Sequence, residues 1–302
     1  MSSNIVPKAE SYCGYVAIIG RPNVGKSTLL NHVLRQKLSI TSRKPQTTRH
    51  NLLGVDTERA FQAIYLDTPG IHDDVKRAIN RYMVKKATSI LVDVDLVAMV
   101  LDRDKWTAHD DLVLQHIKRA GKPTFAIINK IDLIQDKADL LPVIDRLAKM
   151  QLFDEVIPVS ALKREGLDVF RKQVFAMLPA HSHLFPPDQL TDKSERFLVG
   201  EIIREKLMRS LGDELPHRTG VVIEAFKQRD DLVEIQADIY VERNGQKRIV
   251  IGARGEKLKR MGSEARKDIE QLLGCKVMLH LWVKVKAGWT DSRVELSRMG
   301  YD

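Results

Sequence analysis

Hydrophobic positions in the first 180 residues form short apolar runs that alternate with segments of helical period. The apolar runs cover residues 15–20, 61–67, 94–102, 124–130 and 155–161. The amphipathic segments lie between most of these runs and cover residues 28–35, 109–120, 137–150 and 166–177. Strands alternating with helices predict an α/β domain over residues 11–180, after an N-terminal tail at 1–10. We expect a mainly parallel sheet with helices on both faces.

Residues 51–67 depart from this alternation, because two apolar runs are joined there by only a few polar residues. That connection is too short to cross over between parallel strands, so it predicts an antiparallel hairpin. After Leu178 a segment with prolines and no hydrophobic period predicts a linker at 181–195. Its two histidines, His181 and His183, have no nearby cysteine or histidine to complete a metal site, and we interpret them as linker residues.

The rest of the chain predicts a smaller α+β domain at 196–290, followed by a C-terminal tail at 291–302. It begins with an amphipathic helix whose apolar stripe consists of Phe197, Val199, Ile202, Ile203 and Leu207. Strands are predicted at 220–228, 232–242 and 248–252, a helix at 255–273, and a last strand at 276–286.

Composition adds an expected partner and location. Lys and Arg number 49 against 40 Asp and Glu, a net charge of +9. This balance favours a polyanionic partner, either nucleic acid or an anionic membrane surface, although some soluble proteins are simply basic. No apolar run reaches the roughly 18 residues of a membrane-spanning helix, and the N-terminus has no signal-peptide pattern. With only Cys13 and Cys275, the chain fits the reducing cytoplasm.

The sequence GRPNVGKS begins at residue 20, between a predicted strand and a predicted helix, and fits the phosphate-loop pattern G-x-x-x-x-G-K-[ST]. Gly20 and Gly25 let the backbone turn its N–H groups toward an anion. Lys26 brings positive charge to the β and γ phosphates, and Ser27 offers a hydroxyl to Mg²⁺. The predicted nucleotide contacts here are Gly20, Arg21, Pro22, Asn23, Val24, Gly25, Lys26, Ser27 and Thr28.

Residues 129–132, NKID, directly follow a predicted strand and indicate which base is bound. The Asp132 carboxylate can accept hydrogen bonds from the ring N–H and exocyclic amine of guanine, whereas adenine offers no such pair. Asn129 and Lys130 would brace the base and the surrounding loops. At another strand end, Ser160, Ala161 and Leu162 complete the predicted base site, with the Ala161 N–H available to guanine O6.

The γ phosphate and its metal ion are expected between these motifs. Asp67, Thr68, Pro69 and Gly70 close a predicted strand. Asp67 can hold Mg²⁺ through water, and the Gly70 N–H can reach the γ phosphate. Thr48, next to Arg49 in the preceding loop, is favoured over Thr47 to complete the Mg²⁺ shell. We therefore predict Ser27, Thr48 and Asp67 at the metal, and Lys26, Thr48 and Gly70 around the reacting phosphate.

These motifs in this order resemble the Ras-like GTPase family, which implies binding of GTP and GDP with Mg²⁺. The next residue, Ile71, is a departure, because Ras-like switches have there a glutamine that orients the attacking water. His72 is an alternative residue for orienting the water, but a histidine in a loop more often takes no part in the reaction. GTPases with a hydrophobic residue here form a known group, similar to this chain also in carrying Asn23. In part of that group the asparagine helps to hold K⁺. Slow hydrolysis is expected unless an ion or a partner completes the site.

A second glycine pair, Gly252 and Gly255, brackets Ala253 and Arg254 before a predicted helix. It lacks G-K-[ST], so it does not predict another nucleotide site. The surrounding residues 243–267 are strongly basic: Arg243, Lys247, Arg248, Arg254, Lys257, Lys259, Arg260, Arg266 and Lys267, against Glu256 and Glu264. The G-x-x-G loop, the charge and the element order resemble a K-homology RNA-binding domain of the prokaryotic type. The predicted RNA contacts are Arg248, Gly252, Ala253, Arg254, Gly255, Lys257, Lys259 and Arg260.

The two halves together resemble a bacterial GTPase family that joins a Ras-like domain to a K-homology domain. The resemblance implies a monomer that acts in assembly of the small ribosomal subunit and in processing of its ribosomal RNA, binding near the 3′ end. It also implies peripheral association with the inner membrane. Three alternatives remain: an RNA chaperone with a nearly inactive GTP site, an ATP-driven nucleic-acid enzyme, and a GTPase whose basic patch binds lipid. NKID disfavours the second, and the predicted strands around the patch disfavour the third.

Overall fold

The computed structural model describes residues 11–42, 44, 47–71, 87–212, 219–229, 231–290 and 292. These residues form two compact units. The N-terminal unit contains the described residues of 11–37, 51–71 and 87–192, and the C-terminal unit contains those of 38–50 and 193–292. The predicted tail at 1–10, most of the tail at 291–302, and His72 lie outside the described residues.

The N-terminal unit is built on a six-stranded sheet with the strand order β2-β3-β1-β4-β5-β6. Its strands are β1 (Tyr12–Ile19), β2 (Leu52–Glu58), β3 (Phe61–Asp67), β4 (Leu96–Asp102), β5 (Thr124–Asn129) and β6 (Glu155–Pro158). Only β2 and β3 pair antiparallel, while the other neighbouring strands are parallel. Both the mainly parallel sheet and the short hairpin predicted at 51–67 are confirmed.

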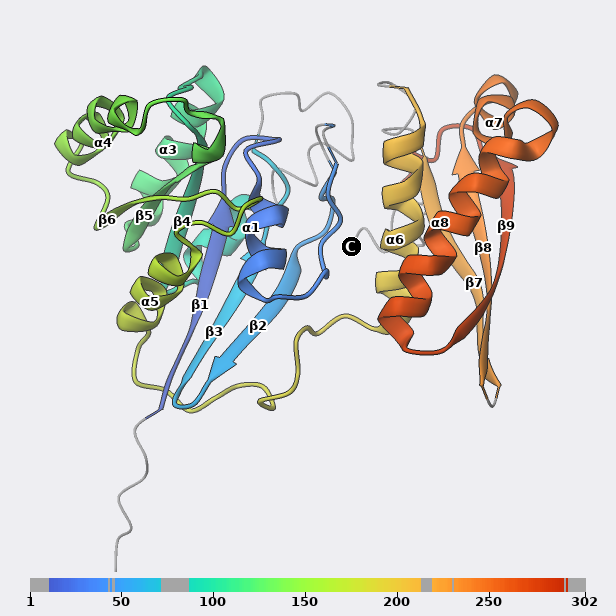
Figure 1. Cartoon of the computed structure of the whole chain (residues 1–302), viewed down its shortest axis with the longest axis horizontal. Coiled ribbons are helices and arrows are strands. Elements are labelled where there is room, and N and C mark those ends of the chain that lie inside the picture. Colours follow the sequence, from blue (N-terminus) through green and yellow to red (C-terminus); the bar gives the residue numbers. More distant parts are fainter. Residues whose placement is uncertain are drawn as a thin grey trace, which may run out of the picture. The chain divides into compact units, whose positions relative to one another are not determined.

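Helices cover both faces of this sheet, as predicted (Figure 1). They are α1 (Lys26–Val33), α3 (Ala108–Ala120), α4 (Leu140–Lys149) and α5 (Leu167–Met177). On one face, apolar residues of α3 and α4 form a core with alternate residues of β1, β4 and β5. Leu66 of β3 packs against that core, so its neighbour Tyr65 points to the opposite face. There Tyr65 contacts Phe170 of α5, with ring centroids 6.1 Å apart.

Residues 180–192 run along the hairpin side of the N-terminal unit and are attached to it by hydrogen bonds. The buried Gln62 carboxamide accepts from the Leu184 and Phe185 N–H groups at 2.8 and 3.0 Å. At the edge strand β2, the Val55 N–H donates to the Leu190 carbonyl at 2.8 Å. Most of the segment predicted as a linker is therefore an ordered part of this unit.

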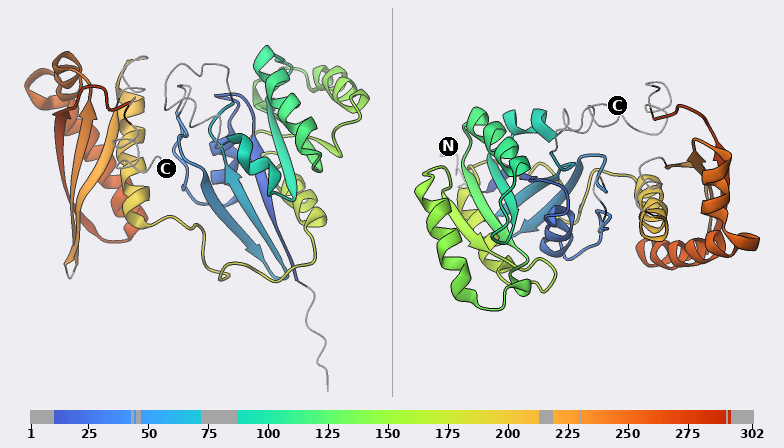
Figure 2. Two further views of the ribbon diagram at one scale, coloured as in Figure 1. Left: turned by 180° about the vertical axis from the view of Figure 1, so that it is seen from behind. Right: turned by 90° about the horizontal axis from the view of Figure 1, so that it is seen from above.

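The C-terminal unit has a three-stranded sheet with the order β7-β8-β9, seen with its helices in Figures 1 and 2. Its elements are α6 (Glu195–Ser210), β7 (Gly220–Arg229), β8 (Leu232–Val241), α7 (Asn244–Ile251), α8 (Glu256–Leu273) and β9 (Lys276–Val285). β7 pairs antiparallel and β9 parallel with the central strand β8. Apolar residues of α6 and α8 cover one face of this sheet.

One predicted element of this unit is wrong. Residues 248–252 were expected to form a strand, but 244–251 form α7. The Gln246 side chain caps the start of this helix, since its oxygen accepts from the Arg243 N–H at 3.1 Å. On α7 the Val250 side chain is buried whereas Ile249 is 51% exposed, so the β-branched run supplies only a narrow apolar face. The glycine pair therefore follows a helix, and the element order is helix, strand, strand, helix, helix, strand.

Candidate functional site

The loop from Gly20 to Gly25 has a backbone that only glycine accommodates at its two ends. Gly20 has φ +152°, and a Cβ atom there would lie 2.6 Å from the Val100 carbonyl oxygen. Gly25 has φ +104°, and a Cβ atom there would overlap the Asn129 carboxamide. Both the positive φ angles and the lack of space require glycine. The loop leads directly into α1, whose first N–H groups carry the partial positive charge that binds anions.

Lys26 closes this loop from inside. Its buried ammonium donates to the carbonyl oxygens of Gly20 and Arg21, both at 3.0 Å. Burial lowers the pKa of Lys26 to about 8, although the nearby Asp67 carboxylate opposes the shift. These two hydrogen bonds hold the backbone of the loop around the Lys26 ammonium group.

Ser27 and Asp67 bring two oxygen-bearing side chains together at the end of β3. The Ser27 hydroxyl donates to Asp67 Oδ2 at 2.7 Å, and the Asp67 side chain is fully buried. The next residue, Thr68, donates to the Ile18 carbonyl at 2.9 Å, which fixes the strand end against β1. Hydroxyl and carboxylate oxygens are suitable for Mg²⁺, so this part of the predicted metal site fits the ion.

Gly70 and Ile71 pack directly against the phosphate loop. A Cβ atom on Gly70 would lie 2.7 Å from the Pro22 nitrogen, so a side chain has no room there. The Ile71 N–H donates to the Gly20 carbonyl at 3.3 Å, and the Ile71 side chain is buried in the core beside α3 and α4. Ile71 is therefore a packing residue, consistent with the prediction that it cannot orient water.

The residues predicted to read the base form one hydrogen-bonded group at the ends of β5 and β6. Asn129 Nδ2 donates to the Val24 carbonyl at 2.8 Å, while Asn129 Oδ1 accepts from the Ala161 N–H at 2.9 Å. The Ser160 hydroxyl donates to Asp132 Oδ1 at 2.5 Å. The Ala161 N–H predicted to face guanine is thus engaged within the protein in this structure. Leu162 is exposed.

Two charged side chains at this site have partners that the motifs did not predict. Lys130 donates to the Asn23 carbonyl at 2.7 Å and pairs with Asp102 at 2.9 Å. Burial alone would raise the pKa of Asp102, but hydrogen bonds from Lys130 and Arg103 lower it below its usual value. Arg21 pairs with the fully buried Asp110 at 3.1 Å, so its guanidinium is held by a carboxylate of α3. Asp102 ends a predicted strand, and that position was the only sequence signal for it.

Thr48 belongs to a segment that the fold groups with the C-terminal unit. Beside it, the Thr47 carbonyl accepts from Arg204 at 2.6 Å, and Arg49, 1% exposed, donates to the Thr219 carbonyl at 3.0 Å. The Thr41 N–H donates to the buried Glu205 at 2.9 Å. Sequence patterns did not predict these contacts with α6 and with Thr219, and the role of Thr48 in the metal shell remains a prediction.

The second glycine pair forms an open turn between α7 and α8. Gly252 and Gly255 have φ angles of +77° and +81°, and Arg254 also has a positive φ of 49°. Ala253 and Arg254 are both exposed, and no heavy atom lies within 4 Å of a Cβ atom placed on Gly255. The turn therefore presents its middle residues to solvent, at the start of a long helix.

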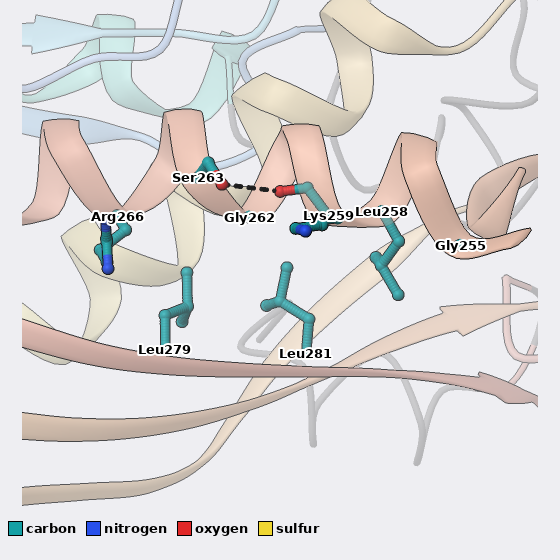
Figure 3. Close-up of a pocket in the computed structure, with 8 residues that line it drawn as sticks. All are labelled: Gly255, Leu258, Lys259, Gly262, Ser263, Arg266, Leu279 and Leu281. Carbon is teal, nitrogen blue, oxygen red and sulfur yellow. Dashed lines mark hydrogen bonds between the residues drawn. The ribbon is translucent and has the colours of Figure 1, made fainter.

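A groove of about 390 Å³ extends from this turn between α8 and β9 (Figure 3). We call it the α8–β9 groove, and its lining residues are Gly255, Leu258, Lys259, Gly262, Ser263, Arg266, Leu279 and Leu281. In Figure 3 Leu279 and Leu281 point from β9 toward α8, and Ser263 bonds to the Lys259 carbonyl at 3.0 Å. A Cβ atom on Gly262 would lie 3.3 Å from Leu281, so glycine keeps the groove open.

Of the predicted RNA contacts, Gly255 and Lys259 line this groove, while Arg248, Gly252, Ala253, Arg254, Lys257 and Arg260 do not. Sequence reasoning missed the leucines and Gly262, which read as ordinary core positions. Their signal was the alternation of Leu279 and Leu281 on the last strand, next to a helix with exposed basic residues. The groove combines an apolar floor with cationic edges, which suits unpaired bases and their phosphates.

Two protein-family models match the chain. Residues 15–130 match the model described as a 50S ribosome-binding GTPase, and residues 214–290 match the model of the KH domain.

Among the described residues, none of the helices is both long and apolar enough to span a membrane.

Similar proteins cover nearly the whole chain. GTPase Era of Ectopseudomonas mendocina is 54% identical over 96% of this chain and 97% of its own. GTPase Era of Pseudomonas aeruginosa is 54% identical over 97% and 96%. Two solved structures each have a TM-score of 0.93 and 40% identity, covering 96% of this chain and 99% of theirs. One is a tyrosine-to-alanine variant of Aquifex aeolicus Era bound to GDP and tetrafluoroaluminate. The other is Era in complex with MgGDPNP and nucleotides 1506–1542 of 16S ribosomal RNA.

Proposed function

The chain belongs to the GTPase Era family, and on that premise we propose that it hydrolyses GTP and binds the small-subunit ribosomal RNA near its 3′ end. Its role is in assembly of the small ribosomal subunit and in processing of that RNA. The α8–β9 groove carries the proposal, because its leucine floor, its cationic edges and the glycine turn at its end are suited to single-stranded RNA. The family relation supplies the identity of the RNA.

The nucleotide contacts follow from the geometry of the N-terminal unit. The N–H groups of the phosphate loop face the phosphates, and Lys26 shifts from its carbonyl partners to the β and γ oxygens. Asp132, held by Ser160, accepts from the guanine N–H and amine groups. Asn129 links the base-binding loop to the phosphate loop through Val24, so the two ends of the nucleotide are read by one connected group.

Ser27 and Asp67 would hold the Mg²⁺ ion, Asp67 through water, and Thr48 would complete its shell. When bound, this ion neutralises charge on the β and γ phosphate oxygens. The Gly70 N–H and Lys26 face the γ phosphate. Because Ile71 is buried and apolar, the chain itself offers no glutamine at that position to orient water. We therefore expect slow hydrolysis without a partner or an ion, and Asn23 is the residue that would contact K⁺.

At the C-terminal unit, the turn from Gly252 to Gly255 approaches the RNA backbone. Arg248, Lys257, Lys259 and Arg260 lie around the turn and contribute positive charge to phosphate binding. Ala253 and Arg254 are exposed and lie against phosphate. The helix that follows the turn adds N–H groups at its start.

The test is the double variant Ala253→Asp with Arg254→Asp in the full-length chain. Both positions are exposed at a helix start, where carboxylates are tolerated, so folding should persist. We expect affinity for single-stranded RNA to fall by at least about tenfold, from loss of one charge-assisted contact and added repulsion. Wild-type RNA affinity should also fall with salt, by a slope of roughly −0.7 per phosphate contact.

A matched control is Ala253→Ser with Arg254→Lys, which keeps the size and charge of the turn and should keep RNA affinity. Guanine nucleotide affinity should be the same in all three proteins. A folded aspartate variant with unchanged RNA affinity would leave the turn as a purely structural feature.

The second candidate function is an RNA chaperone whose GTP site is nearly inactive, which the buried Ile71 favours. Measuring GTP hydrolysis with and without RNA separates the two. Acceleration of GTP hydrolysis by RNA supports the GTP-hydrolysing function proposed first, whereas equally negligible hydrolysis in both conditions supports the chaperone.

We also propose that the protein acts in the cytoplasm, since its RNA partner is ribosomal. We further propose that it is a monomer, as the family resemblance implies. Peripheral association with the inner membrane remains part of the proposal, supported by the family resemblance and the net charge of +9. Flotation with anionic vesicles tests this association. The protein should float with the vesicles at low salt and remain in the dense fractions at high salt, because the attraction is electrostatic.

A further inference from the structure

The C-terminal sheet has a second face, opposite to α6 and α8, that the proposed function does not use. We call it the outer face. On β9 the odd-numbered residues point toward the helices, and Val277 and Val283 are accordingly buried. The even-numbered residues point the other way, where Met278 is 46% and Trp282 47% exposed. The outer face therefore exposes large apolar side chains near the middle of an edge strand.

Two ring side chains lie together on this face. His280 and Trp282 are neighbours on β9, with ring centroids 5.7 Å apart and an angle of 31° between their planes. Across the strand pair, His280 lies beside Gln236 and Trp282 beside Asp238. A half-exposed indole next to an imidazole offers a flat surface on which a nucleobase can stack.

The charges around these rings are of the sign that attracts phosphate. The register places Glu234 beside Met278 and Lys227 beside Glu234, so all three share this face. Glu234 is paired with Arg229 at 3.2 Å and Asp238 with Lys284, and Glu224, at the bulge of β7, also interacts electrostatically with Lys284. Lys227 and Lys276, both exposed, take part in no ion pair within the described part of the chain. The net charge left on the face is positive.

The outer face is also continuous with the α8–β9 groove. β9 is an edge strand, and its residues Leu279 and Leu281 line the groove while His280 and Trp282, between and beyond them, lie on the outer face. A K-homology groove grips about four nucleotides. A longer strand leaving the groove can cross the β9 edge of the sheet toward Trp282.

We propose that the outer face is a second single-stranded RNA site, in which an unpaired base stacks on Trp282 and His280 while Lys227 and Lys276 hold the adjacent phosphates. This site rests on the proposed RNA-binding function and extends it. It makes the C-terminal unit bind a strand that wraps around the edge of its sheet. Short RNA is then held by the groove alone, and longer RNA by both faces.

The test compares a four-nucleotide and a ten-nucleotide single-stranded RNA on the full-length chain. Trp282→Leu should weaken binding of the ten-nucleotide RNA about tenfold, as expected for loss of one base–aromatic stack, and should leave the four-nucleotide RNA unaffected. Trp282→Phe keeps an aromatic ring and should retain most of the affinity. Trp106→Leu, in the N-terminal unit, is the matched control and should change neither.

A direct readout comes from the chain's three tryptophans, labelled with 5-fluorotryptophan and assigned by single substitutions. The Trp282 fluorine resonance should shift with the ten-nucleotide RNA and remain in place with the four-nucleotide RNA. This measurement holds even if the leucine variant folds poorly. A resonance that no RNA moves, or that moves only with anionic phosphatidylglycerol vesicles, would overturn the second site.

The double aspartate variant of the glycine turn separates this inference from the proposed function. If that variant loses both RNAs while Trp282→Leu loses neither, the groove function stands and the second site fails. If the wild-type chain binds neither RNA, the proposed function itself fails.

Discussion

The two glycine turns of this chain look alike in sequence, and they differ in what surrounds them. Around the phosphate loop, a Cβ atom on Gly25 would overlap Asn129, and the loop interior is occupied by Lys26. At the second turn, a Cβ atom on Gly255 meets no heavy atom within 4 Å. Both turns need a positive φ, and at Gly252 of the second turn a Cβ atom would also lie only 2.6 Å from the Lys257 Cβ. The turns therefore differ at their second glycine, which is enclosed at Gly25 and open at Gly255. An enclosed turn suits a small ligand that must be surrounded, whereas an open turn suits a polymer that must pass by.

The sharpest way to test this contrast is to remove Lys26, the lysine that occupies the interior of the first turn. Lys26→Ala should lower affinity for GTP by at least about a hundredfold, since charge-assisted hydrogen bonds to two phosphates are lost. RNA affinity of the same full-length variant should be unchanged. Isothermal titration with a GTP analogue and with RNA measures both, and an equal loss of the two would mean that the turns do not act separately.

Guanine selection tests the enclosed site at its other end. Asp132→Asn removes a charged acceptor, so GTP affinity should fall roughly ten- to a hundredfold. Xanthosine triphosphate should bind better than in the parent, because xanthine presents a carbonyl where guanine has an amine. Competition between the two nucleotides reports the change in preference. If the asparagine variant binds GTP as the parent does, Asp132 does not read the base.

Enclosure also predicts a pH dependence confined to the first turn. The pKa of free Lys26 is lowered by burial to about 8, and phosphate oxygens raise it on binding. Nucleotide binding therefore takes up a proton above pH 8, and affinity should fall as pH rises through that value, by up to about tenfold per unit. Titrations from pH 7 to pH 9 should show this slope in the parent. The slope should be absent in Lys26→Ala, and its persistence there would assign it to another group.

The smallest effect concerns the glycines themselves. Gly255→Ala should destabilise the C-terminal unit by only about 1 kcal/mol, the cost of a left-handed backbone in alanine. Gly25→Ala should cost distinctly more, because the overlap with Asn129 adds to the strain. Urea unfolding of the two variants gives the comparison. Equal losses would show that space is not what distinguishes Gly25 from Gly255.

The N-terminal unit was largely predictable because its motifs are local and each follows a strand. Once strands alternate with helices, their ends meet at one edge of the sheet, so the proximity of Ser27 to Asp67 followed from order alone. The partners of Arg21 and Lys130 did not follow, because Asp110 and Asp102 belong to no motif. The Arg21–Asp110 pair depends on how α3 packs, and the Lys130–Asp102 pair depends on β4 lying next to β5; the hydrophobic period leaves both open.

The C-terminal unit was predicted less well, for two physical reasons. Residues 249–251 are β-branched and favour a strand, but the Gln246 cap and the buried Val250 stabilise a helix there instead. The groove was missed because Leu279 and Leu281 face a helix and appear as core in the sequence. The groove exists because α8 has a glycine, Gly262, opposite Leu281, so that no side chain fills this side of the interface.

The attachment of residues 180–192 decides where the chain can be cut. A fragment ending at residue 180 would keep Gln62 but remove the Leu184 and Phe185 N–H groups that its oxygen accepts, leaving a buried amide without them. It would also remove the Leu190 carbonyl that pairs with the Val55 N–H, baring the edge strand β2 to other chains. The autonomous folding unit therefore extends to about residue 192, and a shorter GTPase fragment is expected to aggregate.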